Sequence, residues 1–264
     1  MKRAKNTYNI QAVSNAAALI EVFQGGEEFG VSELARRLGL HKNNVFRLLA
    51  TLQECGYIEQ EKSSDRYRLG PRCYELGRAY LRHGNFGKWA QSLLGGLVRE
   101  TGETVHLGVL RDFEVLHLQV AVSDQLLRAV SRVGKRLPSH CTALGKVLLG
   151  CGDIGLKEAY DRDVVHAGRL EACTTRSLLD REKLFEELRA VGTQGYALDN
   201  EECEVGIRCV AAPVRDGSSG VVAAVSISAP AFRMSETELV ERVVPVLQFA
   251  CDRISRGLGY RPSL

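Results

Sequence analysis

The segment from Leu40 to Tyr57, with the sequence LHKNNVFRLLATLQECGY, constrains the fold more than any other stretch of the chain. Apolar residues recur along it at helical spacing and predict one narrow buried stripe; they are Val45, Leu48, Leu49 and Leu52. Polar donors cluster toward the start of the same helix, where they can reach phosphates or base edges; they are Lys42, Asn43, Asn44, Arg47 and Thr51. This arrangement is typical of a helix that reads DNA.

The stretches on either side of this helix predict a winged helix-turn-helix. Upstream, residues 31–39 (VSELARRLG) indicate a short helix that is capped at Gly30 and Glu33 and ends at Gly39. Downstream, residues 57–61 and 66–69 flank the polar sequence KSSD and predict a hairpin, the wing. Two short helices joined by a tight turn form the DNA-binding helix-turn-helix motif.

Six residues are predicted to contact DNA, namely Lys42, Asn43, Asn44, Arg47, Thr51 and Arg66. Lys42 and Arg66 are expected to contact phosphates rather than bases, because positioning contacts are numerous and carry no sequence information. Asparagine can pair bidentately with adenine, a contact worth roughly 1 to 3 kcal/mol of discrimination. The alternative for Arg47 is a surface arginine that pairs with Glu33 or Glu54.

The length of 264 residues leaves room for two domains that each bury a core of their own. Residues 1–83 hold 13 Lys and Arg against 9 Asp and Glu, a formal charge of +4, whereas the remainder holds 22 against 23, or −1. The basic surplus therefore lies in the predicted DNA-binding part, as attraction to phosphates requires. The chain lacks an apolar run of roughly 18 residues and a signal-peptide core, so we expect a cytoplasmic protein that does not enter a membrane.

A helix from Pro71 onward is expected to connect the two domains. Its apolar residues form a single stripe, made of Leu69, Cys73, Leu76 and Tyr80. The stripe packs either within the chain or against a second copy, and we expect self-association because helix-turn-helix proteins commonly read paired half-sites. With a boundary at His83 to Asn85, the predicted organisation is a DNA-binding domain (residues 1–70), a linker helix (71–84) and a second domain (85–264).

The second domain is predicted to be an antiparallel α+β domain. Strand-like alternation or apolar runs occur at residues 103–110, 113–122, 126–134, 207–214 and 221–228. Helical spacing occurs at 140–150 and again from Asp180 to a stop at Gly192, while residues 196–202 are expected to enter a loop. A capping box of Ser235 and Glu238 opens the last helix, which Pro245 is expected to kink. Strands interrupted and followed by helices favour the α+β class.

Several segments, in order along the chain, resemble the IclR (isocitrate lyase regulator) family of bacterial transcription factors. VSELARRLGLHKNNVFRLLATLQECGYI and RYRLG resemble the family's winged helix-turn-helix domain. TGETVHLGVL, RVGKRLPSHCTALGKVLL, GYALDNEECEVGIRCVAAPV and VVAAVSIS resemble its effector domain. The resemblance covers most of the chain and implies a GAF-like ligand domain and binding to operator DNA as a dimer or tetramer. Asn43 and Asn44 depart from the family, which usually carries Ser or Thr there, so this chain's operator is expected to differ.

Residues of the second domain suggest a pocket for a small organic acid. Ser226 and Ser228 project from one face of a strand, and Cys209 on the preceding strand can approach them, with Asp199 at the edge of the acidic loop. The resemblance implies that these four positions line an effector pocket, completed by the backbone amides of two residues, Ala143 and Leu144. Amides at a helix N-terminus attract an anion such as a carboxylate. Ser139 stands where the family more often has an apolar residue, and it would make the pocket more polar if it faced inward.

Each pocket residue also has a structural interpretation: the serines as exposed strand residues, Cys209 as a small buried residue and Asp199 as a solvated turn acid. The acidic run at Glu201, Glu202 and Glu204 is expected to be a solvated loop that holds Arg208 or another basic residue.

Eight cysteines without a CxxC pair fit neither disulfides nor a zinc finger. A zinc- or redox-sensing regulator that uses Cys141, Cys203, Cys209 and His140 is one alternative function, and a thiol enzyme is another. The favoured hypothesis is a regulator that is no enzyme and has no cofactor. We expect it to bind operator DNA as a homo-oligomer, to respond to a small organic acid and to repress a catabolic operon.

Overall fold

The computed structural model describes residues 10–25, 27–61, 63–82, 86–129 and 133–261. The chain divides into two compact units, Met1–Gly84 and Asn85–Leu264, and each is described by itself. The predicted boundary at His83 to Asn85 lies outside the described residues. No helix within the described ranges is long and apolar enough to cross a membrane.

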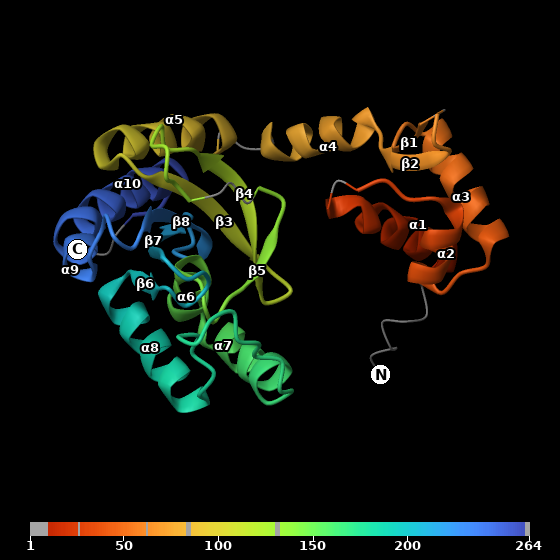
Figure 1. Cartoon of the computed structure of the whole chain (residues 1–264). Coiled ribbons are helices and arrows are strands. Elements are labelled where there is room, and N and C mark those ends of the chain that lie inside the picture. The colour runs from red at the N-terminus through yellow and green to blue at the C-terminus, as the bar shows by residue number, and fades with distance from the viewer. Residues whose placement is uncertain (1–9, 26, 62, 83–85, 130–132, 262–264) are drawn as a thin grey trace. The chain divides into compact units, whose positions relative to one another are not determined.

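The first unit is a winged helix-turn-helix followed by one further helix (Figure 1). Its elements are α1 (Gln11–Glu21), a 3-10 turn (Val22–Gly25), α2 (Val31–Leu38), α3 (Lys42–Glu54), β1 (Ile58–Glu61), β2 (Arg66–Leu69) and α4 (Pro71–Arg82). The strands β1 and β2 pair antiparallel, with Ile58 opposite Leu69. The predicted helix pair and wing are therefore both present.

Local signals in the sequence fix the turn that orients α3. The Gly30 amide donates to the Glu33 carboxylate at 3.0 Å, which closes the start of α2. Gly39 ends that helix in the left-handed region, with a φ of 64° that favours glycine. The predicted apolar stripe of α3 is buried at Val45, Leu49 and Leu52, whereas Leu48 is only half-buried. Burial of this stripe leaves the opposite face of α3 in solvent.

The second unit is built on a six-stranded antiparallel sheet in the order β5-β4-β3-β8-β7-β6. The strands are β3 (Thr104–Arg111), β4 (Glu114–Ala121), β5 (Arg136–Pro138), β6 (Ala197–Asn200), β7 (Ile207–Arg215) and β8 (Val221–Pro230). The helices are α5 (Phe86–Thr101), α6 (Ala143–Gly150), α7 (Ile154–Tyr160), α8 (Arg181–Gln194), α9 (Glu236–Glu238) and α10 (Val244–Gly257). Together the two units confirm the predicted α+β class.

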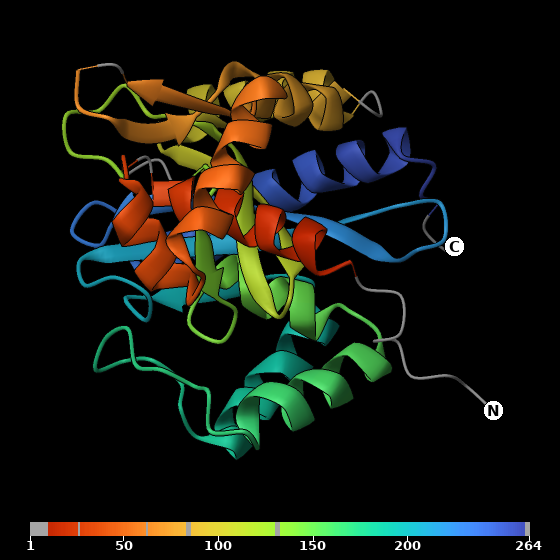
Figure 2. The ribbon, with the colours of Figure 1, turned by 90° about the vertical axis from the view of Figure 1, so that its right-hand side faces the viewer.

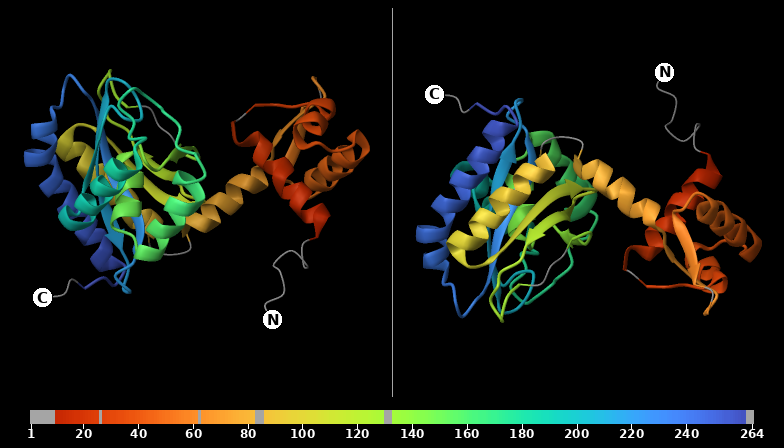
Figure 3. Two further views of the ribbon diagram at one scale, coloured as in Figure 1. Left: turned by 90° about the horizontal axis from the view of Figure 1, so that it is seen from below. Right: turned by 90° about the horizontal axis from the view of Figure 1, so that it is seen from above.

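Helices cover both faces of this sheet (Figures 2 and 3). On one face, α5 and α10 pack on Val210, Ala212, Val225 and Ile227. On the other face, α6 and α8 pack on residues that alternate with these, including Ala211 and Ala224. The two-residue period of a strand thus sends neighbouring side chains into two separate cores. Small residues dominate the second face, which brings α6 close to the strands.

Two of the strand predictions were wrong. Residues 126–129 are irregular, 133 and 134 form a turn, and 130–132 lie outside the described residues. Leu126 and Leu127 are 98% and 65% exposed, so these two leucines are not buried against the sheet. The edge strand β5 follows it instead. Residues 196–202 were expected to enter a loop, yet β6 occupies Ala197–Asn200 and pairs with β7.

One helix prediction also needs correction. Helix α8 continues past Gly192 and ends at Gly195, which has a φ of 73°. Gly192 instead allows a close helix contact, since a Cβ there would lie 2.7 Å from the Gly150 carbonyl oxygen of α6. The predicted capping box of Ser235 and Glu238 is present. An irregular π turn spans Leu239–Val243 before the proline, which stands in the first turn of α10, and the kink at Pro245 stays a prediction.

Candidate functional site

The first candidate site is the exposed face of α3. All five of its predicted DNA contacts are exposed; they are Lys42, Asn43, Asn44, Arg47 and Thr51. The hydroxyl of Thr51 donates to the Arg47 carbonyl at 2.9 Å, so its proton is used within the helix. Phe46, which the sequence interpretation did not consider, is 57% exposed beside them. A large exposed ring next to amide and guanidinium donors is suited to contact with a thymine methyl group.

Arg66 has partners inside the domain. Its Nε and Nη2 donate to the Glu28 carbonyl at 3.1 and 2.6 Å, and Nη2 lies 2.9 Å from the Glu33 carboxylate. The side chain is half-buried and ties the wing to the start of α2. Glu33 is thus engaged by Arg66, and within the described residues Arg47 makes no ion pair. The predicted DNA contact of Arg66 stays a prediction.

The wing itself is close to electrically balanced. Arg68 lies between three acidic side chains, with nitrogen-to-oxygen distances of 3.5 Å to Glu59, 3.5 Å to Glu61 and 3.8 Å to Glu28. The accessible positive charges near the turn include Lys42 and Arg47 of α3, together with the exposed Arg36 at the end of α2. This distribution concentrates attraction for a polyanion at the start of α3.

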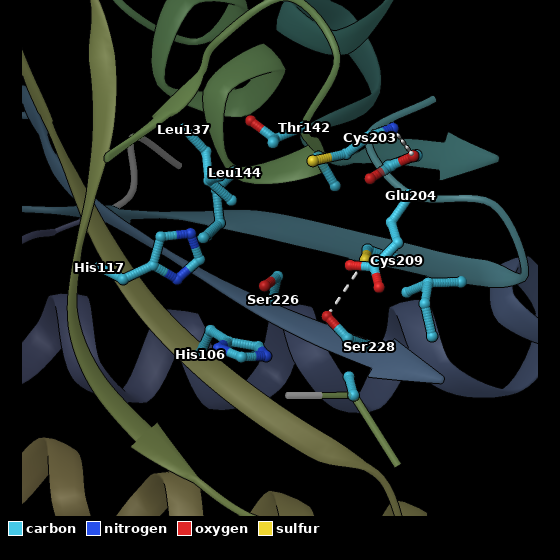
Figure 4. A pocket seen from close by; sticks show the side chains of 14 residues that line it. His106, His117, Leu137, Thr142, Leu144, Cys203, Glu204, Cys209, Ser226 and Ser228 are labelled. Atoms are coloured by element: carbon cyan, nitrogen blue, oxygen red, sulfur yellow. Dashed lines mark hydrogen bonds between the residues drawn. The ribbon is translucent and has the colours of Figure 1, made fainter. Parts of the chain in front are cut away.

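The second candidate site is a cavity between α6 and the sheet of the second unit (Figure 4). All six residues predicted to bind an effector line it, namely Ala143, Leu144, Asp199, Cys209, Ser226 and Ser228. The cavity volume is about 40 Å³. Because one water needs roughly 10 to 15 Å³ of such volume, the space takes about three or four water-sized groups. In this conformation the cavity suits a very small ligand.

Strand register explains why these polar side chains meet. Asp199 on β6 pairs with Cys209 on β7, and Cys209 pairs with Ser228 on β8. Two residues earlier on β8, Ser226 pairs with His106 on the neighbouring strand β3. Ser226 and Ser228 are only 3% and 5% exposed, and Ser228 Oγ donates to the Cys209 thiol at 3.1 Å. The interpretation of the serines as exposed strand residues is therefore wrong.

The start of α6 supplies the wall opposite the sheet. Thr142 caps this helix, because its Oγ accepts from the Gly145 amide at 3.2 Å and donates to the Pro138 carbonyl at 2.9 Å. The next two amides, those of Ala143 and Leu144, belong to the first turn, whose N–H groups have no partner within a helix. Such amides attract anions, which is the physical basis of the predicted carboxylate contact at this edge of the cavity.

Asp199 is buried, with 3% exposure, and the interpretation as a solvated turn acid is wrong. Its Oδ1 accepts from the amides of Glu202 and Cys203 at 2.8 and 3.3 Å. Burial, followed by the nearby Glu202 carboxylate, raises the pKa of Asp199 to about 7. This carboxyl is thus able to accept or donate a hydrogen bond near neutral pH.

The acidic run is only partly a solvated loop. Glu204 is exposed, and Glu201 lies 3.7 Å from Arg208, as expected. Glu202 is instead buried and contacts the fully buried Lys146 Nζ at 2.7 Å, with Glu187 at 3.2 Å. A buried ammonium group needs such partners, and this requirement draws the acidic turn against α6.

Two histidines in the cavity were missed by the sequence interpretation. His106 on β3 and His117 on β4 are both buried, and their rings meet edge to face with centroids 5.3 Å apart. The signal was a polar residue at an inward position of each alternating strand. Imidazoles in this position give the cavity two further groups that can bind a carboxylate.

Ser139 does not line this cavity. It is buried, and its hydroxyl donates to the Phe113 carbonyl at 2.7 Å. Its backbone packs so closely on α6 that a Cβ on Gly145 would lie 2.3 Å from the Ser139 Cα. Ser139 therefore does not face the cavity and does not make it more polar.

The four residues of the metal or redox alternative do not converge. The Cys209 thiol accepts a hydrogen bond from Ser228, and the His140 Nε2 atom lies 2.9 Å from the Glu171 carbonyl oxygen. Cys141 and Cys203 do lie together, but their third neighbour is Cys173.

Comparison with known proteins identifies both halves of the chain. Residues 12–62 match the family model "IclR helix-turn-helix domain". Residues 78–256 match the model "Bacterial transcriptional regulator IclR C-terminal". The two matches together span most of the described structure.

Similar proteins match over nearly their full length. The chain is 34% identical to the HTH-type transcriptional regulator KdgR of Escherichia coli strain K12, over 97% of this chain and 95% of that protein. It is 36% identical to XynR of the same strain, over 95% and 98%. The crystal structure of an IclR regulator from Alicyclobacillus acidocaldarius superposes with a TM-score of 0.85 at 28% identity, covering 96% and 100%.

Proposed function

The chain belongs to the IclR family of bacterial transcriptional regulators, and on that premise we propose that it is a ligand-responsive repressor that binds operator DNA as a homo-oligomer. Residues 1–70 bind DNA, 71–84 link the domains, and 85–264 bind a small carboxylate effector. The observation that carries this proposal is the convergence of six predicted polar groups on one buried cavity.

On the DNA side, α3 enters the major groove with Arg47, Asn43 and Asn44 directed at base edges. Lys42 contacts a phosphate. The support is the exposure of these side chains and the internal neutralisation of the wing arginine Arg68. Because the asparagines can select adenine, operator preference resides at these two positions.

On the ligand side, the effector carboxylate lies at the amides of Ala143 and Leu144, and its remaining polar groups contact Ser226, Ser228 and Asp199. The cavity volume of about 40 Å³ favours an acid with few non-hydrogen atoms. An effector changes operator affinity only through its different affinities for the protein's alternative conformations.

Self-association through α4 completes the proposal. The apolar side chains that this helix leaves in solvent include Tyr74 and Leu76, which are 68% and 50% exposed, and Leu69 before it is 37% exposed. Tyr80, the last residue of the predicted stripe, has no described side chain. Pairing this face with a second copy removes apolar surface from water and gives two reading helices for two half-sites. The negative sign of regulation is supported by similarity to the transcriptional repressor IclR of E. coli strain K12, 29% identical over 250 residues.

The proposal is tested with DNA fragments from the intergenic regions beside the protein's own gene. Fluorescence anisotropy should detect specific binding to one fragment, released by one of a panel of two- to four-carbon carboxylic acids. The Ser226→Ala, Ser228→Ala double variant should bind the same DNA and ignore the acid, while Ser218→Ala, on an exposed turn, should respond normally. Specific DNA binding that no acid alters would refute the assigned effector class.

A further inference from the structure

Three thiols from distant parts of the chain meet beside the effector cavity. The Sγ atoms of Cys141, Cys173 and Cys203 all lie within 4.8 Å of one another. Those of Cys141 and Cys173 are 3.2 Å apart, and none of the three residues forms a disulfide. The structure assigns these residues a zinc-binding site, and this goes beyond the proposed response to an organic acid.

The spacing of the sulfur atoms matches what a thiolate-bound zinc ion requires. With Zn–S bonds of about 2.3 Å and tetrahedral angles, ligand sulfurs are about 3.8 Å apart. The observed separations, from 3.2 Å to at most 4.8 Å, enclose this value. The three sulfurs are therefore already close to the spacing that a shared zinc ion requires.

Hydrogen bonds hold two of the three segments together independently of any ion. The loop that carries Cys173 is tied to the turn that carries Cys203, because Thr174 Oγ donates to the Glu201 carbonyl and Ser177 Oγ to the Glu202 carbonyl, both at 2.7 Å. Ser177 Oγ also accepts from the Cys173 amide at 3.0 Å. This preformed arrangement lowers the ordering cost of binding.

The third ligand and the access route follow from the fold. Cys141 directly precedes the capped start of α6 and is fully buried, whereas Cys173 is exposed. An ion can therefore reach the cluster from the Cys173 side. Zinc is borderline-soft and prefers thiolates, and three protein ligands leave a fourth tetrahedral position for water or another donor.

The zinc site and the effector cavity share a residue. Cys203 belongs to the thiol cluster and also lines the cavity. A bound ion would fix this part of the wall and so change affinity for the effector, a coupling that works equally in both directions. This consequence rests on the proposed function, but the zinc site itself does not.

The test begins with full-length protein that has been reduced, checked for all eight free thiols and stripped of metal with a chelator. Titration with Zn²⁺ against a chromophoric chelator should show one ion bound per chain. Co²⁺ should give thiolate-to-metal charge-transfer bands and the ligand-field spectrum of a tetrahedral site. Absence of zinc binding by the reduced wild-type protein would overturn the assignment.

Substitution identifies the ligands. Because Cys173 is exposed, the Cys173→Ser variant should fold normally. It should nevertheless lower zinc affinity at least about a hundredfold, since loss of a residue that only hydrogen-bonds to a metal ligand already costs roughly 10- to 100-fold. Cys55→Ser, also an exposed cysteine but outside the cluster, should bind zinc as the wild type does. Equal affinity in the two variants would overturn the site. Operator binding in chelator should be unchanged in Cys173→Ser, so a failed zinc site leaves the proposed DNA-binding function standing.

Discussion

The exposed face of α3 and the cavity of the second unit are both rich in polar groups, but they hold them in opposite ways. On α3 the donors come from a single helix and are exposed. One of them, Arg47, makes no ion pair within the described residues. Around the cavity the groups come from several strands and the start of α6, are buried, and contact one another, as Ser228 does Cys209. A substitution on α3 should therefore change binding alone, whereas one behind the cavity should also change folding.

The largest effect is expected from Glu202→Ala. It removes the 2.7 Å partner of Lys146, which is 1% exposed, and leaves only the more distant Glu187. Because a buried charge that loses its partner costs about 3 to 5 kcal/mol, the opening free energy of β7 and β8 should fall by that amount in hydrogen exchange. Glu186→Ala, an exposed residue on α8, should change it by less than about 0.5 kcal/mol. A loss below about 1 kcal/mol in Glu202→Ala would show that the buried pair does not support the cavity.

The next effect is expected from Arg47→Ala, which tests the other side of the comparison. Loss of a base-edge contact should weaken specific operator binding by about 1 to 3 kcal/mol, or roughly 5- to 150-fold. Stability and effector affinity should not change, because the side chain is exposed and makes no ion pair within the described ranges. Anisotropy with operator and scrambled DNA measures both specific and non-specific binding. Arg256→Ala, which removes an exposed arginine of α10 paired with Asp252, is the matched control. Retained sequence specificity in Arg47→Ala would refute the assigned reading helix.

The same contrast explains how far the sequence could predict each site. The α3 face was predictable because all its groups lie on one helix, so spacing alone separates the buried Val45 and Leu49 from the exposed Arg47. For the cavity, alternation put Ser226 and Ser228 on one face. The pairing of Asp199 with Cys209 depends on β6, and the sequence interpretation took that segment to be a loop.

What the sequence could not predict depends on contacts between distant segments. Cys173 joins Cys141 and Cys203 only because a long loop folds back on the acidic turn, and nothing in the local spacing signals this. His106 and His117 alternate with apolar residues like ordinary strand positions, so their shared cavity appears only when β3 and β4 pair. Strand pairing and loop closure, unlike helical period, leave little trace in neighbouring residues.

The smallest effect, expected from Arg66→Gln, tests whether the wing belongs to the scaffold or to the DNA-reading surface. Arg66 joins Glu28 and Glu33 across 38 and 33 residues of sequence, yet its side chain is 42% exposed. Since ion pairs at such exposure contribute about 0 to 1 kcal/mol, we expect a small loss of stability in thermal unfolding. If the contacts with Glu28 and Glu33 are the whole role of Arg66, the salt dependence of operator binding should not change. A phosphate contact would instead make the slope of log affinity against log salt shallower by roughly 0.9. Lys42→Gln is the matched comparison, because Lys42 is exposed at the start of α3 and should show that shallower slope. If Arg66→Gln shows it too, Arg66 belongs with α3 as a DNA contact, and its contacts with Glu28 and Glu33 are secondary.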